Sequence, residues 1–411
     1  MTQKLNIIIA NDYAHITGGA DKVAIISAIS LAEKNYDVYF FSSVGPVSEE
    51  LKCSNVNVIC LNQNDILSNK NRFQAAIYGI WNIRARLKFK LLLKKLNNKF
   101  TIIHLHSFTK GLSTSIIREA INENFKLVLT LHDYFAVCPN GGFFNYNTNE
   151  ICHLKPMSRK CILCNCDSRK YVHKIWRVLR QNKQTKRGLL PSGIDNYIYI
   201  SEMSKNVLVS FLPPNAKLYY VKNPVDIEKG KSVNVIKNNS FVYVGRLSKE
   251  KGCLLFAEAA KELNVNAVFV GDGELRDEIK RIYPESRITG WVDKMQVVNE
   301  LDSTRALVFP SLLYETLGLT ALEAQARGIP VIVSDACAVR EVVKNRRTGL
   351  WFKRGDLEDL EEKMKLLMND KLAKIYGQNA YLDYWENDFS IESHINQLEK
   401  VYDDISKRGE K

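Results

Sequence analysis

The sequence predicts an α/β fold with two domains, each a sheet covered by helices. Short apolar runs alternate with longer amphipathic segments along the 411-residue chain, which is typical of strand–helix–strand units. A chain of this length is too long for one hydrophobic core and suits two α/β domains. Its hydrophobic content of 45% and charged content of 25% are those of a globular protein.

The elements follow in order along the chain. Strands are expected at residues 5–10, 38–41, 101–106, 127–132, 198–201, 241–245, 267–271, 306–309 and 331–333. Helices are expected at 18–34, 202–211, 253–263, 317–327 and 391–405. A stretch rich in Pro, Asn and Lys, residues 213–240, is the expected crossing between the domains. We assign residues 1–218 to the first domain, 219–385 to the second and 386–411 to a terminal helix.

The composition limits the partners and the compartment. With 58 Lys and Arg against 45 Asp and Glu, the formal net charge is +13. This excess favours an anionic partner, which is nucleic acid, anionic lipid or a phosphorylated substrate. No apolar run approaches the roughly 18 residues of a membrane span, and no signal-peptide pattern opens the chain. Nine cysteines without such a signal favour free thiols. We therefore expect a cytoplasmic protein.

A glycine pair, Gly18-Gly19, follows the first expected strand and opens a helix that runs to about Lys34. The bare N–H groups of such a helix start, together with the helix dipole, favour an anion. An ordinary strand-to-helix turn has the same pattern, so the pair alone is a weak indication of a site.

Two neighbouring strands of the first half, 101–106 and 127–132, each end in a histidine. Ligands of open α/β sheets bind at the carboxyl ends of the strands. His106 and His132 are therefore candidates for the site, although either one alone is more often structural.

The segment from Arg84 to Lys99 contains seven basic residues and no acid. Leu87, Leu91, Leu92 and Leu96 within it follow helical spacing. This helix either packs on its own sheet or lies on an anionic membrane, because basic residues flank the apolar stripe.

A second basic block, residues 155–187, has eleven Lys and Arg against one Asp, with Tyr171 and Trp176 among them. No motif of a nucleic-acid-binding module accompanies it. Lipid or phosphate is therefore the better interpretation of its charge.

A cysteine cluster extends from Cys138 into the second basic block, to Cys166, and includes a C-x-x-C pair. Four thiolates can hold zinc tetrahedrally, and the candidate ligands of a structural zinc are Cys138, Cys152, Cys161 and Cys164. Reduced thiols without a metal are the alternative. A catalytic zinc is not expected, because no general base accompanies the cluster.

Arg246 and Lys251 follow the strand expected at 241–245. One guanidinium and one ammonium at the carboxyl end of a strand suit a diphosphate, with no metal needed. Surface cations without a ligand are the alternative for each alone.

Two acids belong to the strand–loop–helix unit that starts at 306–309. Glu315 lies at the helix start, where a negative charge is favoured. Glu323 lies four residues after Leu319 and close to the packed face, where a carboxylate is costly unless it is hydrogen-bonded. Together they indicate a binding edge.

The frame P-S-x-x-Y-E-x-x-G-L-x-x-x-E-A-x-x-x-G-x-P-V-I around these acids resembles retaining glycosyltransferases of the GT-B class, family 4 type. V-G-R-L-x-x-x-K-G around Arg246 and Lys251 and T-L-H-D around His132 are also similar to motifs of that family. The match extends over nearly the whole chain and is most specific in residues 241–335.

The resemblance implies two doubly wound, Rossmann-like domains that face each other across a cleft. It implies transfer of a sugar from a UDP- or GDP-sugar to an acceptor hydroxyl, with retention and without a catalytic metal. The implied catalytic residues are His132, Glu315, Arg246 and Lys251. The implied donor-binding residues are Gly18, Gly19, His106, Arg246, Lys251, Gly318, Leu319 and Glu323. Among these, Glu323 is expected to hold the ribose, and residues 288–292 to face the base.

A lipid-linked or free saccharide is the expected acceptor, as in the assembly of capsule or lipopolysaccharide. The basic segment from Arg84 to Lys99 then favours peripheral contact with the inner face of the cytoplasmic membrane. No nucleic acid is expected as a partner. Two alternatives stay open at this point: a nucleotide-sugar epimerase of the same fold, and a basic nucleic-acid-binding protein.

Overall fold

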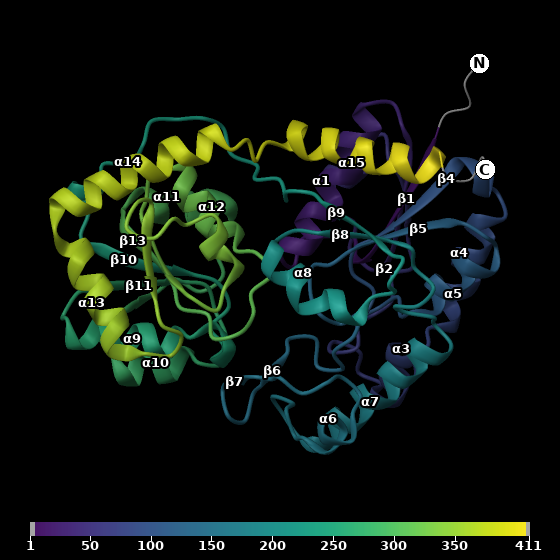
Figure 1. Cartoon of the computed structure of the whole chain (residues 1–411), viewed down its shortest axis with the longest axis horizontal. Helices are drawn as coiled ribbons and strands as arrows, with labels where there is room; N and C mark the ends of the chain where they lie inside the picture. Colours follow the sequence, from purple (N-terminus) through teal and green to yellow (C-terminus); the bar gives the residue numbers. More distant parts are fainter. Residues whose placement is uncertain (1–4, 408–411) are drawn as a thin grey trace.

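The computed structural model describes residues 5–407, in which the chain forms two large parallel sheets, one in each half (Figure 1). The strand order is β3-β2-β1-β4-β5-β8-β9 in the first and β12-β11-β10-β13-β14-β15 in the second. All neighbours in both sheets run parallel. The order reverses beside β1 and beside β10, which is the doubly wound pattern. The predicted pair of doubly wound domains is therefore present.

The first sheet consists of β1 (Asn6–Tyr13), β2 (Asp37–Val44), β3 (Asn57–Cys60), β4 (Thr101–Leu105), β5 (Lys126–Thr130), β8 (Asn196–Tyr199) and β9 (Lys217–Tyr220). Its helices are α1 (Gly19–Glu33), α2 (Glu49–Lys52), α3 (Arg72–Ile80), α4 (Ile83–Leu93), α5 (Ser115–Asn122) and α8 (Glu202–Leu208). An insert between β5 and β8 holds the antiparallel pair β6 (Phe144–Asn145) and β7 (Glu150–Ile151), then α6 (Arg159–Leu163) and α7 (Tyr171–Lys186).

The sequence predicts the strand at 198–201 as the last strand of the first domain, and this prediction is wrong. β9 follows it inside the expected crossing and pairs with β8 from Asn196↔Lys217 to Tyr199↔Tyr220. Its side chains are only partly buried, so its sequence lacks the apolar run that marks an inner strand. The first sheet therefore extends just past residue 218.

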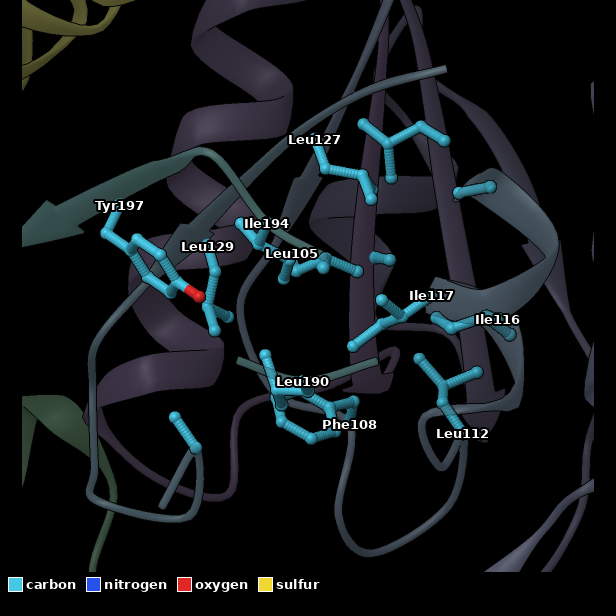
Figure 2. Close-up of a cluster of buried hydrophobic side chains, with 14 of the residues drawn as sticks. Leu105, Phe108, Leu112, Ile116, Ile117, Leu127, Leu129, Leu190, Ile194 and Tyr197 are labelled. Carbon is cyan, nitrogen blue, oxygen red and sulfur yellow. The ribbon is translucent and has the colours of Figure 1, made fainter. Parts of the chain in front are cut away.

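The core on one face of this sheet joins α5 to the central strands (Figure 2). Ile116 and Ile117 of α5 pack with Leu105 of β4 and Leu129 of β5, and Leu112 belongs to the same cluster. Each such side chain contributes about 1.5–3 kcal/mol when it is fully buried. This core holds the loop after β4, which leads toward the site.

The second sheet consists of β10 (Ser240–Val244), β11 (Asn266–Val270), β12 (Arg287–Ile288), β13 (Thr304–Phe309), β14 (Val331–Ser334) and β15 (Gly349–Phe352). Its helices are α9 (Cys253–Glu262), α10 (Arg276–Ile282), α11 (Lys294–Asp302), α12 (Leu319–Ala326), α13 (Leu357–Met368) and α14 (Asp370–Glu386).

The last helix, α15 (Ile391–Lys407), leaves the second domain and lies against α1 of the first (Figure 1). Leu398 and Val401 join the core beneath α1, and Tyr402 Oη lies 2.7 Å from His104 Nδ1. Residues 1–4 and 408–411, which the sequence assigns to the ends of the first domain and of the terminal segment, lie outside the described residues.

The exposed apolar residues of α4 are not the same set as the apolar stripe that the sequence predicted. Phe89 and Leu92 are buried, whereas Ile83, Leu87 and Leu91 are each more than half exposed. The reason is that Leu92, together with Phe89, packs toward the sheet and α5, and periodicity alone does not say which apolar face a helix buries. Within residues 5–407, no helix has both the length and the apolar character needed to cross a bilayer.

Candidate active site

A cavity of about 610 Å³ lies between the two domains, where the carboxyl ends of β10 and β13 face the start of α1. In doubly wound sheets this end of the strands is the place where ligands bind. Its lining includes the predicted Gly18, Gly19, His132, Arg246, Lys251, Glu315, Gly318, Leu319 and Glu323. The fold therefore brings together, in one cavity, residues from distant parts of the sequence.

Lys251 and Glu315 form the closest ion pair in the second-domain wall. Lys251 Nζ donates to both carboxylate oxygens of Glu315, at 2.9 and 2.7 Å, and Ser311 Oγ donates to the same carboxylate at 3.1 Å. The pair depends on Gly252, whose φ is +68°, because a Cβ there would lie 2.0 Å from the carbonyl oxygen of Pro310. The tight approach of these two loops places the ammonium beside the carboxylate.

Arg246 is held more loosely than Lys251. Its Nη2 lies 3.0 Å from Oε1 of Glu250, and its side chain is 62% exposed. Its partner Glu250 is buried, but that carboxylate also accepts a hydrogen bond from Ser248 Oγ at 2.8 Å. The exposed guanidinium can therefore turn toward an anionic ligand in the cavity while Glu250 keeps this second hydrogen bond.

Glu323 has a partner that the sequence analysis missed. Lys22 Nζ, on α1 of the first domain, donates to Glu323 Oε1 at 3.1 Å across the cavity. The pair supplies the hydrogen bond that a half-buried carboxylate on α12 requires. Lys22 lies in the first turn of the helix that Gly18-Gly19 opens. Its position beside that glycine pair could have indicated from the sequence that Lys22 belongs to the site.

His132 is a neutral residue in the first-domain wall. Its Nε2 lies 2.9 Å from His106 Nδ1, and the two rings stack with centroids 5.1 Å apart. Burial lowers the pKa of His132 to about 3 and holds the pKa of His106 well below its ordinary value. Thr316 Oγ1, from the second domain, donates to the carbonyl oxygen of His132 at 2.8 Å.

His106 does not line the cavity, contrary to its predicted place among the donor-binding residues. It follows β4 and is almost fully buried, so the end of β4 places it one layer behind His132. Its contact with the His132 ring makes it a positioning residue for that ring.

The glycines of the cavity serve two purposes. A Cβ on Gly18 would meet nothing within 4 Å, so this residue borders open space, whereas one on Gly318 would lie 2.5 Å from Val339 Cγ2. Gly19 faces Leu319 closely, with 3.1 Å between the position of a Cβ and Leu319 Cδ1.

Trp291, in the loop predicted to face a base, is exposed and also lines the cavity.

The cysteine cluster lies in the insert, away from this cavity. Cys138 and Cys161 are buried, and Cys152 and Cys164 are partly exposed. The ammonium of Lys174 lies 3.2 Å from the sulfur of Cys166 and 3.7 Å from that of Cys161. Across the described residues, 5–407, no three His, Cys, Asp or Glu side chains are arranged to share a metal ion. The structural zinc stays an untested prediction.

Comparison with protein families assigns both halves of the chain. Residues 225–383 match the family model described as glycosyl transferases group 1. Residues 17–229, more than half of the chain, match the model of glycosyltransferase family 4. The chain belongs to glycosyltransferase family 4. The predicted family is thereby confirmed, and the protein is an enzyme of the glycosyltransferase class, EC 2.4.

Two relatives of this glycosyltransferase are themselves named as sugar transferases. It is 29% identical over 343 residues to the UDP-Gal:alpha-D-GlcNAc-diphosphoundecaprenol alpha-1,3-galactosyltransferase of Escherichia coli, covering 77% of this chain and 78% of that one. It is 27% identical over 186 residues to the capsular polysaccharide biosynthesis glycosyltransferase CapM of Staphylococcus aureus, covering 42% of this chain and 48% of that one.

Solved structures confirm the GT-B fold. Sucrose-phosphate synthase of Thermosynechococcus elongatus superposes with a TM-score of 0.70 at 16% identity, over 98% of this chain and 99% of that one. HepE of Anabaena, solved in complex with UDP, superposes with a TM-score of 0.66 at 14% identity, over 97% of this chain and 100% of that one.

Proposed function

We propose that this glycosyltransferase moves a sugar from a UDP- or GDP-sugar to an acceptor hydroxyl with retention of anomeric configuration. The observation that carries the proposal is the single cavity between the domains, which collects two acids, three cations and a neutral imidazole. Such a set matches the groups of a nucleotide-diphosphate sugar, which has a sugar, a charged diphosphate and a ribose.

Arg246 and Lys251 take the diphosphate in this proposal. Negative charge grows on it as the bond to the sugar breaks, and fixed cations stabilise that change. Lys251 is already aimed at the cavity by Glu315, and Arg246 is free to turn. The balance of charge uses these two side chains alone, so the mechanism assigns no step to a metal.

The two acids hold the sugars of the donor. Glu323 accepts hydrogen bonds from the ribose after its carboxylate leaves Lys22, and Glu315 orients the transferred sugar while it stays paired with Lys251. His132, which is neutral at pH 7, contacts that sugar by hydrogen bonding near the reacting carbon, with His106 fixing its ring.

The proposed reaction proceeds by attack on the same face. The acceptor oxygen forms a bond to the anomeric carbon as the bond from that carbon to the phosphate oxygen breaks. The proton of the acceptor hydroxyl passes to the departing phosphate oxygen. This route needs no carboxylate nucleophile, in contrast to a retaining glycosidase.

We propose a lipid-linked saccharide as the acceptor, in the assembly of a surface polysaccharide such as capsule or lipopolysaccharide. The name of the Escherichia coli relative includes a diphosphoundecaprenol-linked sugar, and that of CapM a capsular polysaccharide, which supports this class of acceptor. With such an acceptor, the proposed location of the enzyme is the cytoplasm, at the inner face of the membrane.

Contact with that membrane is assigned to the basic segment from Arg84 to Lys99. The exposed Ile83, Leu87 and Leu91 of α4 form an apolar line at four-residue spacing, flanked by lysines and arginines.

Flotation with anionic liposomes tests this contact. The double variant with Leu87→Ser and Leu91→Ser should lose flotation, whereas Leu382→Ser, which removes an exposed leucine from α14, should keep it. A wild-type protein that stays at the bottom of the gradient contradicts the contact.

A thermal-shift panel of UDP- and GDP-sugars tests the donor. A donor at 100 times its Kd stabilises the folded state by about 2.7 kcal/mol, so one nucleotide series should raise the Tm. NMR of the product made from that donor should show retention. The proposal fails if no nucleotide sugar changes the Tm, or if the product is inverted.

A further inference from the structure

A second cavity, of about 620 Å³, adjoins the donor cavity. The two cavities share His132, Arg246, Lys251, Glu315 and Thr316 in their linings. The second one extends from His132 along the first domain to the insert between β5 and β8. A molecule there would lie beside the residues that are proposed to contact the transferred sugar.

Buried polar atoms in this lining lack partners. Tyr134 is 1% exposed and Asn140 is 5% exposed, and both line the cavity. Among the described residues, neither Tyr134 Oη nor Asn140 Oδ1 has a hydrogen-bond partner. Leaving such a group unsatisfied costs about 1–3 kcal/mol, so the lining is suited to a ligand that supplies hydroxyl groups.

Asp133 lies beside them and next to His132. One oxygen accepts the N–H of Phe135 at 2.8 Å, and burial raises the pKa of the carboxyl to about 6. The group is therefore ionised at neutral pH and can accept a hydrogen bond from a sugar hydroxyl. A saccharide fits this end of the cavity.

Cations line the wall formed by the first domain and the insert, namely Lys110, Arg169 and Arg177. Buried Asp167 orients both arginines, with its carboxylate 2.6 Å from Arg177 Nε and 3.8 Å from Arg169 Nε. Asp12 fixes the loop of Lys110 by accepting its backbone N–H at 2.8 Å. Guanidinium groups held in this way are suited to phosphate oxygens.

Asp167 offsets one of these three positive charges, and the acids that line the cavity lie on its other sides. Glu250 and Glu315 are paired with Arg246 and Lys251 on the opposite wall. Asp133 lies at the saccharide end, and Glu274 comes from the second domain.

Two residues of this lining, Leu67 and Arg169, precede helices with exposed apolar side chains, α3 and α7. Leu67 lines the cavity and is exposed, and the chain runs from it to α3, where Phe73 is 77% exposed. Arg169 leads directly into α7, where Val172 is 63% exposed. The two helices pack against each other, with Trp176 donating to a carbonyl of α3 at 3.0 Å (Figure 1). Neither helix contains an acid.

We propose that this second cavity is the acceptor subsite for a saccharide carried on a lipid diphosphate. The sugar contacts Asp133 and Tyr134, the diphosphate lies at Arg169 and Arg177, and the lipid leaves past Leu67 along α3 and α7. The proposal rests on the proposed function, because it takes the first cavity as the donor site.

The test uses farnesyl diphosphate as a probe that has the lipid and the diphosphate but no sugar. Binding is measured by calorimetry on the full chain saturated with the nucleotide, UDP or GDP, that the thermal-shift panel selects. Saturation blocks Arg246 and Lys251, so the probe reports the second cavity. Inorganic diphosphate and farnesol are measured in parallel.

Arg169→Gln and Arg177→Gln should each weaken the binding of farnesyl diphosphate at least tenfold. Arg187→Gln, which removes an equal charge from the exposed end of α7, should change it less than threefold. The double variant with Phe73→Ser and Val172→Ser should bind farnesyl diphosphate more weakly than wild type but should bind inorganic diphosphate equally well. A Tm within a few degrees of wild type checks the fold of each variant, and Arg169→Gln breaks only the longer contact to Asp167.

Two results overturn the inference. One is a nucleotide-saturated wild type that does not bind farnesyl diphosphate, and the other is equal binding by wild type and Arg169→Gln. In both cases nucleotide binding by the same protein still stands, so the donor site survives the loss of the acceptor subsite. A protein that binds no nucleotide contradicts the proposed function instead.

Discussion

Lys22 of the first domain and Glu323 of the second meet across the donor cavity, with 3.1 Å between the ammonium and the carboxylate. The two side chains are about one-fifth exposed, and they come from the first turn of α1 and the middle of α12. A donor whose ribose takes Glu323 must displace Lys22. The ion pair therefore competes with the ribose of a donor for Glu323.

The two halves of this ion pair should differ in their effect on the donor. Glu323→Ala should weaken nucleotide binding at least tenfold, because it removes the group that accepts the ribose hydroxyls. Lys22→Ala should change it less than threefold, because it removes only a competitor for that carboxylate. Calorimetry with UDP and GDP measures both. Equal losses would mean that the pair serves only to hold the domains together.

Removal of either diphosphate cation should reduce turnover. Arg246→Ala and Lys251→Ala are each expected to lower kcat about 100-fold or more, which corresponds to about 2.7 kcal/mol or more of lost transition-state stabilisation. Lys249→Ala is the matched control, since Lys249 is exposed in the same turn and lines neither cavity. Steady-state kinetics with the selected donor measures all three. A control that loses as much as the site variants would contradict the assignment.

Asp133→Asn should stabilise the protein at high pH. Burial raises the pKa of Asp133 from 3.8 to about 6, so the folded state binds this proton more tightly than the unfolded state. Stability from this group falls as pH rises from about 4 to 6, and the full cost, at most about 3 kcal/mol, remains above pH 6. Asparagine is neutral throughout and can still accept the N–H of Phe135.

The measurement is the Tm of both proteins at pH 4.5 and pH 8. The gain of Asp133→Asn over wild type should be larger at pH 8. The same variant should transfer sugar more slowly, because it lacks the carboxylate proposed to meet the acceptor. If the Tm difference between the two proteins does not depend on pH, burial does not raise the pKa of the Asp133 carboxyl.

Tyr402→Phe should destabilise the contact between α15 and the first domain. It leaves His104 Nδ1 without its 2.7 Å partner in a fully buried position, which costs about 1–3 kcal/mol. Urea unfolding measures the loss. Tyr381→Phe, which removes an exposed hydroxyl contact on α14, is the control and should cost less. If the two variants lose the same free energy of unfolding, the buried contact between Tyr402 and His104 contributes no more to stability than the exposed one.

The inner strands and the donor-side residues could be predicted from the sequence. Inner parallel strands are continuous apolar runs, and the residues that follow them lie at one edge of the sheet. In the two large sheets, the strands that the sequence did not predict are β3, β9, β12 and β15, which are the edges of those sheets. β3, β9 and β12 are short and partly exposed, so they lack that run, whereas β15 is mostly buried but has only four residues.

The sequence by itself determined the doubly wound fold, the family, and four charged residues of the donor cavity, Arg246, Lys251, Glu315 and Glu323, because these depend on local runs and fixed spacings. Only the tertiary structure decided that Lys22 meets Glu323, that His106 lies behind His132, and that α4 buries Leu92. Such contacts join residues far apart in the chain or select one of two apolar faces, and local spacing contains no information about either.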